Sequence, residues 1–181
     1  MNQSVKDKKI NNLIALYSQG DIERAISEAK KLTKVYKKEP FLFNFLGVAS
    51  VGIGSVDKAI RYYKEALSLN PQYYEVYNNI GLAYSDLKKS DVAIKYLNKA
   101  IQISPDYAEA YNNIGNTQKN LGNTSEAILN YKKAININPN YADAYTNLGI
   151  VHSVLEEFEE AEKAFKKALS FDGRNVNIAY Y

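Results

Sequence analysis

The sequence contains no cysteine and no tryptophan, and it has one methionine and one histidine among its 181 residues. Without cysteine there is no disulfide framework, no thiolate metal site and no thiol nucleophile. This absence fits a reducing compartment, so we expect the protein to be cytoplasmic. The single histidine, His152, has no second His or Cys with which to bind a metal, and we expect neither a metal site nor a cofactor.

Long apolar runs and a large excess of one charge are also missing. No stretch approaches the ~20 apolar residues needed to span a bilayer, and the N-terminus lacks the apolar core of a signal peptide. Lys and Arg total 23 against 20 Asp and Glu, and this formal charge of +3 is too balanced to indicate nucleic-acid binding. With 46 % apolar and 24 % charged residues, the composition is typical of a soluble folded protein, and we expect no membrane or nucleic-acid partner.

The sequence does contain a strict 34-residue period, which is considered before any shorter motif. Four repeats align without a gap: 40–73, 74–107, 108–141 and 142–175. Repeat position 4 is aromatic, position 8 is glycine, and positions 20 and 27 are alanine in all four repeats. This agreement indicates one structural unit that is repeated four times.

Each repeat divides into two predicted helices. The first runs from about repeat position 2 to 14, where apolar or small residues fall at helical spacing. A turn follows, often with glycine as at Gly54 and Gly122, and the second helix starts near position 18. A recurrent proline at position 32 (Pro71, Pro105 and Pro139) ends the second helix. A helix pair of this kind buries its apolar face only by stacking on its neighbours.

This pattern resembles the tetratricopeptide repeat (TPR). In the repeat 74–107 it is carried by Tyr77, Ile80, Gly81, Tyr84, Ala93, Leu97, Ala100 and Pro105. The family's usual Trp at position 4 is Phe or Tyr here, and position 11, usually Tyr, varies. The resemblance implies an all-α fold, a right-handed α-solenoid of antiparallel helix pairs. It also implies a non-catalytic scaffold for protein–protein interaction, which binds an extended peptide or a partner protein in its concave groove.

The two ends of the chain depart from the period. Residues 1–39 resemble a degenerate helix pair, and we expect this pair to cap the array. Residues 176–181 begin a further or capping helix and then stop. Because terminal repeats normally need a polar outer face, we expect one of two arrangements. Either the chain is a piece of a longer protein, or the open end, with Tyr180, pairs with another copy. The alternatives to a stand-alone scaffold are accordingly the substrate-recruiting N-terminal region of a larger enzyme, of the glycosyltransferase or sulfotransferase type, and a self-assembling scaffold.

Asparagine recurs at repeat position 6, although Asn inside a helix costs roughly 0.7 kcal/mol relative to Ala. The recurring residues are Asn79, Asn113 and Asn147. They resemble the asparagine ladder in the repeat array of protein O-GlcNAc transferase, where the amides hold the backbone of an extended peptide. A carboxamide both donates and accepts, so it can pair with any peptide unit. At ~100° per residue, Asn116 and Asn120 lie on the same helix stripe and would assist.

The alternative is that the ladder residues are solvated surface positions, as we expect for Asn78 and Asn112 next to them. The stripe also carries a carboxylate near the start of three first helices: Glu75, Glu109 and Asp143. A favourable interaction with the helix dipole explains them simply, but their charge would also bias the groove toward neutral or basic peptides.

The stripe of the first regular repeat is apolar instead, with Phe41, Phe45 and Val48. Either the N-terminal helices fold over these residues, or they form an exposed docking patch. Nothing indicates catalysis, because His152 occupies a packing position and the acidic run 156–162 is consistent with a turn and a solvated helix face. We therefore expect that the chain is not an enzyme.

Overall fold

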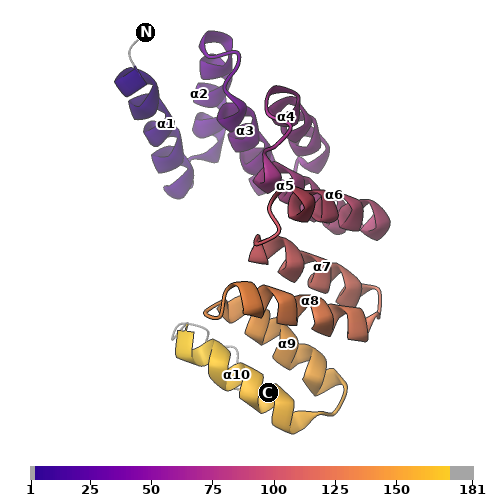
Figure 1. Cartoon of the computed structure of the whole chain (residues 1–181). Coiled ribbons are helices and arrows are strands. Elements are labelled where there is room, and N and C mark those ends of the chain that lie inside the picture. The colour runs from indigo at the N-terminus through magenta and orange to yellow at the C-terminus, as the bar shows by residue number, and fades with distance from the viewer. Residues whose placement is uncertain (1–2, 172–181) are drawn as a thin grey trace. The chain divides into compact units, whose positions relative to one another are not determined.

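The computed structural model describes residues 3–171, which form ten α-helices joined by short turns, with no β-strand among them (Figure 1). The helices are α1 (Gln3–Ser18), α2 (Ile22–Val35), α3 (Pro40–Gly52), α4 (Val56–Leu69), α5 (Tyr74–Asp86), α6 (Ser90–Ile103), α7 (Ala108–Asn120), α8 (Thr124–Ile137), α9 (Ala142–Val154) and α10 (Phe158–Phe171). Internal contacts divide the chain within α5 into an N-terminal unit, residues 1–83, and a C-terminal unit, residues 84–181. The predicted all-α fold of helix pairs is confirmed. The predicted helix start at 176–181, with Tyr180, lies outside the described residues.

Each regular repeat holds one helix pair, within about one residue of the register that its sequence pattern predicts. In the repeat 40–73, α3 covers repeat positions 1–13 and α4 covers positions 17–30. The turn between the helices has a left-handed backbone at position 15, where φ is 73° at Gly54 and 80° at Gly122. Lys88 and Glu156 adopt the same conformation, with φ of 59° and 60°. Glycine does so without the steric cost that a side chain adds, so the latter two turns carry local strain.

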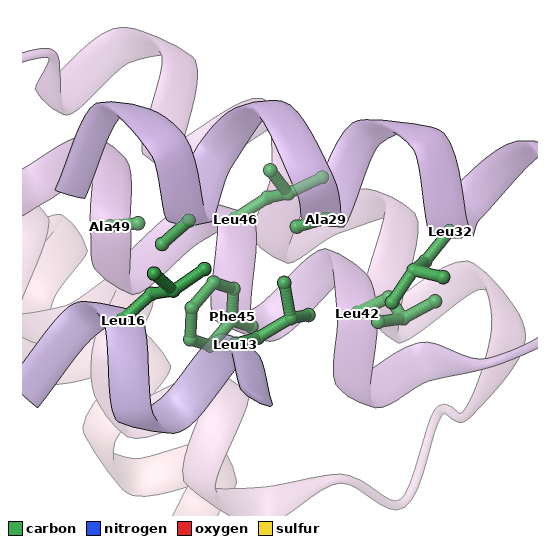
Figure 2. Close-up of a cluster of buried hydrophobic side chains, with 9 residues drawn as sticks. Leu13, Leu16, Ala29, Leu32, Leu42, Phe45, Leu46 and Ala49 are labelled. Atoms are coloured by element: carbon green, nitrogen blue, oxygen red, sulfur yellow. The ribbon is translucent and has the colours of Figure 1, made fainter. Parts of the chain in front are cut away.

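The N-terminal unit has a hydrophobic core to which α1, α2 and α3 all contribute. Figure 2 shows side chains from the three helices meeting in it, among them Leu13, Leu16, Leu32, Leu42 and Leu46. The degenerate pair at the start of the chain therefore packs through its leucines on the first regular repeat. Close packing of this kind excludes water from the apolar surface and stabilises the stack.

The apolar stripe of α3 belongs to this core. Phe45 is only 8 % exposed, and its ring lies edge-on against Tyr17, with the ring centroids 5.9 Å apart. Phe41 packs against the same cluster, and its ring is 6.3 Å from that of Phe45, while Val48 is half-buried. Of the two readings of Phe41, Phe45 and Val48, the exposed docking patch is therefore wrong, and coverage by the N-terminal helices holds. The N-terminal helices cover the stripe because its apolar residues gain more from burial than from water contact.

In the C-terminal unit, the glycine at repeat position 8 allows an aromatic ring to lie directly on the first helix. A Cβ atom added at Gly115 would lie 2.5 Å from Cε1 of Tyr131, and one at Gly149 would lie 2.6 Å from Cε1 of Phe165. Both rings are buried. The close approach joins α7 to α8 and α9 to α10, and it explains why position 8 has no side chain.

Candidate functional site

Asparagine amides connect successive repeats through a network of side-chain hydrogen bonds. In the N-terminal unit, Nδ2 of Asn79 donates to Oδ1 of Asn44 over 3.0 Å. In the C-terminal unit, Nδ2 of Asn147 donates to Oδ1 of Asn112 over the same distance. In each case an Asn at position 6 donates to an Asn at position 5 of the preceding repeat. The ladder residues therefore take part in inter-repeat packing.

A tyrosine at position 34, the last residue of the repeat that holds the accepting asparagine, completes each network. Tyr73 forms a side-chain hydrogen bond with Asn44, and Tyr141 forms one with Asn112. Burial is the main reason that the pKa of Tyr141 is raised to about 12, and the nearby charges of Glu109 and Asp143 add to it. These tyrosines and the position-5 asparagines were missed by sequence reasoning. The signal was present, since Tyr recurs at position 34 and Asn at position 5.

The expectation that Asn78 and Asn112 are solvated is wrong. Asn78 is 0 % exposed and Asn112 is 4 % exposed, because position 5 faces the neighbouring repeat rather than water. A buried amide must find hydrogen-bond partners, and Asn112 has them in Asn147 and Tyr141.

The predicted peptide-binding residues differ in how far they reach the surface. Asn113 is buried, at 7 % exposure. Four others are half-buried: Glu75, Asn79, Asn116 and Asn147. Three are exposed: Glu109, Asn120 and Asp143. Asn79 and Glu75 lie in the N-terminal unit and the other six lie in the C-terminal unit.

In the C-terminal unit, the first helices α7 and α9 carry these residues on one stripe, here called the Asn face: Glu109, Asn113, Asn116, Asn120, Asp143 and Asn147. Asn116 is held by Tyr131, whose hydroxyl donates to Oδ1 of Asn116 over 2.8 Å. The amides of Asn116 and Asn147 are therefore oriented by bonds to the packing residues beneath them. Their remaining amide groups are positioned before any ligand arrives.

A hollow of about 540 Å³ lies beside the start of α7 and the end of α8. Its lining includes two carboxylates, Asp106 and Glu109, and two aromatic rings, Tyr107 and Tyr141. The Tyr107 hydroxyl donates to Oε2 of Glu109 over 2.8 Å. The C-terminal end of α8 also borders the hollow, and a helix C-terminus carries partial negative charge. The N-terminal start of α7 borders it as well and carries partial charge of the opposite sign, so the net negative charge of the hollow comes from its two carboxylates, and its lining has no basic residue.

His152 is buried and contacts a carboxylate, with 2.5 Å between its Nδ1 and Oε2 of Glu157. This contact joins the end of α9 to the turn before α10. Within residues 3–171, no group of three or more His, Cys, Asp or Glu side chains is placed to hold a metal ion. Over that same range, no helix is both long and apolar enough to cross a membrane.

Sequence models of the tetratricopeptide repeat match the chain at residues 12–67, 74–107, 96–128 and 142–175. A further model, described as TPR repeat, matches residues 53–88 and 119–153. Together the matches cover residues 12–175 without a gap. No match was found among curated protein sequences.

Solved structures with the same arrangement of helix pairs include MamA, which is 29 % identical with a TM-score of 0.73 over 90 % of this chain and 95 % of MamA. PilF of Pseudomonas aeruginosa is 18 % identical, with a TM-score of 0.85 over 97 % of this chain and 80 % of PilF. YrrB, described as a TPR protein with an unusual peptide-binding site, is 22 % identical, with a TM-score of 0.66 over 95 % of this chain and 89 % of YrrB. At these identities PilF and YrrB are similar in fold alone.

Proposed function

Because the chain belongs to the tetratricopeptide repeat family, we propose that it is a non-catalytic scaffold that binds an extended peptide of a partner protein along its first helices. The TPR fold supports a role in protein interaction. The description of YrrB provides a precedent for a peptide on this fold. More specifically, we propose that the amides of the Asn face in the C-terminal unit bind the backbone of that peptide.

One observation carries the proposal: the amide of Asn147 is oriented by its bond to Asn112, and the residue is only partly buried. That bond uses one N–H of the amide, so the carbonyl oxygen and the second N–H remain for a peptide unit. An amide that is already oriented loses little conformational entropy when a ligand binds. The same logic applies to Asn116, whose oxygen is held by Tyr131 while its two N–H groups can donate. Asn120 is exposed further along the same helix and assists.

The preference for neutral or basic peptides rests on the hollow beside α7. A lysine or arginine side chain entering it would meet the carboxylates of Asp106 and Glu109 and the side chains of Tyr107 and Tyr141. Cation–π contact with tyrosine adds to the charge attraction. An acidic side chain would meet charges of its own sign there and would be rejected.

The test starts from peptides selected on the purified chain from a phage-displayed library of random sequences. Isothermal titration calorimetry then compares each peptide with its backbone N-methylated version. We expect N-methylation to raise the Kd at least tenfold, because it removes the peptide N–H groups that would donate hydrogen bonds to the side-chain oxygens of the Asn face. Equal affinity of the two versions would refute backbone recognition.

Two matched variants separate binding from packing. Asn147→Ala removes the proposed ligand amide, whereas Asn112→Ala keeps that amide and removes only the inter-repeat bond that orients it. We expect Asn147→Ala to raise the Kd about tenfold, as the loss of one or two hydrogen bonds implies, and Asn112→Ala to raise it less than about threefold on the same scale. If both variants weaken binding equally while remaining folded by circular dichroism, Asn147 acts only by packing and the proposal fails.

A further inference from the structure

A groove of about 470 Å³ lies between α1 and α2 in the N-terminal unit. Leu13 and Leu32 form its apolar floor, and the exposed side chains of Val5 and Val35 line its rim. Its volume falls in the range of clefts that bind ligands or partner side chains. The groove thus offers an apolar surface for a side chain from outside the unit.

The rim of this groove is basic. It carries Lys8, Lys9 and Lys31 against a single carboxylate, Glu28. Glu28 is already paired with Lys31, whose Nζ lies 2.7 Å from Oε1 of Glu28. Lys8 and Lys9 form no ion pair with any residue in the described part of the chain. The groove therefore combines an apolar floor with unpaired positive charge.

The turn between α9 and α10 in the C-terminal unit has the complementary character. Val154 is 71 % exposed and Phe158 is 68 % exposed, and Leu155 between them is also exposed. Large apolar side chains that gather in water mark interaction sites. We call the cluster of Val154, Leu155 and Phe158 the Phe158 edge.

Carboxylates surround the Phe158 edge: Glu156, Glu157, Glu159 and Glu160. Glu157 contacts His152, and Glu160 is paired with Lys163 over 2.6 Å. Glu156 and Glu159 have no ion-pair partner among residues 3–171. The edge thus presents an aromatic ring flanked by two unpaired negative charges.

We propose that the Phe158 edge of one copy docks in the basic groove between α1 and α2 of a second copy, so that the protein assembles head to tail. The ring of Phe158 would enter the apolar floor at Leu13 and Leu32. The carboxylates of Glu156 and Glu159 would face the ammonium groups of Lys8 and Lys9. Both surfaces are apolar, and their charges are of opposite sign. This chain itself supplies both of them.

The contact is heterologous, because it joins two different surfaces. A dimer made this way still presents one free groove and one free edge, so growth continues unless the copies close into a ring. The proposal uses neither residues 176–181 nor the Asn face amides, and it holds or fails independently of peptide binding.

The first measurement is the mass of the untagged chain by light scattering after size-exclusion chromatography, from about 10 µM to about 1 mM, the range in which contacts of small area are populated. We expect the mean mass to rise above 20.4 kDa with concentration and to fall back when the salt concentration is raised, since salt screens the charge pairs. A constant 20.4 kDa over this range would overturn the proposal, and the groove would then be open to an acidic partner of another kind.

Charge-reversal variants identify the surfaces. Lys8→Glu/Lys9→Glu and Glu156→Lys/Glu159→Lys should each remain monomeric, and mixing them in equal amounts should restore assembly, because each then offers the sign that the other lacks. Lysine at position 156 is compatible with the turn, since Lys88 holds the equivalent place in its repeat. Assembly of either variant alone, or none on mixing, would overturn the proposal.

Control variants change similar side chains elsewhere. Lys37→Glu/Lys38→Glu makes the same charge change on exposed lysines outside the groove and should assemble as the wild type does. Phe158→Ser should lower the association constant at least tenfold, whereas Leu129→Ser, at another exposed apolar residue, should not change it. If Leu129→Ser and Phe158→Ser have equal effects, the Phe158 edge is not the docking surface.

Discussion

Replacing Gly115 by alanine tests whether the glycine at position 8 exists to accommodate the ring of the second helix. Gly115 lies inside α7, and its added Cβ would be 2.5 Å from Cε1, 2.7 Å from Cδ1 and 3.0 Å from Cζ of Tyr131. Carbon atoms pack best at about 3.5–4.0 Å, so the ring would have to move by roughly 1 Å. Tyr131 is fully buried and has no free space into which to move.

The sign of the effect depends on two opposing terms. Alanine is favoured over glycine in a helix interior by about 1 kcal/mol. Overpacking a core of this kind costs about 1–3 kcal/mol. Displacing Tyr131 also loses its hydrogen bond to Asn116, which contributes about 1 kcal/mol. We therefore expect Gly115→Ala to lower the free energy of unfolding by about 1–3 kcal/mol, the balance of these terms.

Urea unfolding followed by far-ultraviolet circular dichroism measures this change as a lower transition midpoint. The control is the same substitution in a Tyr131→Leu background, because the repeat 74–107 carries Leu97 at the equivalent position. There the smaller side chain leaves room, and Gly115→Ala should be neutral or stabilising. If Gly115→Ala stabilises the wild type by about the helix-propensity difference alone, the packing explanation is refuted.

Two further predictions concern the turns and the buried tyrosines. Gly122→Ala should lower the free energy of unfolding by about 1 kcal/mol in urea unfolding, because φ is 80° there and a side chain is strained in that conformation; no change would show that the turn relaxes freely. Burial raises the pKa values of Tyr63 and Tyr131, and that of Tyr141 to about 12, against about 10 in the unfolded chain. The stability from these neutral phenols is fully present below about pH 10 and is lost as the pH rises toward about 12. The urea concentration at the unfolding midpoint should therefore be lower at pH 11 than at pH 8, and equal midpoints would contradict the assigned burial of these tyrosines.

The asparagine network shows where sequence reasoning on the site succeeds and where it stops. The phase of Asn147 on its helix could be derived from the 34-residue period, and the residue lies partly buried on the Asn face. Its bond to Asn112 could not be derived, because it depends on how closely the preceding repeat approaches. The likeness to the ladder of O-GlcNAc transferase, and the peptide-binding role of Asn79, Asn113 and Asn147, remain predictions.

The sequence by itself determined the helix pairs, their register and the family, because glycine, alanine and proline at fixed repeat positions permit little else. Only the tertiary structure decided which polar side chains are buried. Asn112 and Asn120 are the same residue type on one helix, yet one is buried against the next repeat and the other is exposed. The tertiary structure also showed that the N-terminal helices α1 and α2 cover Phe45, while Phe158 stays exposed to water. Burial depends on what the neighbouring helices place over a position, and a one-dimensional pattern does not contain that information.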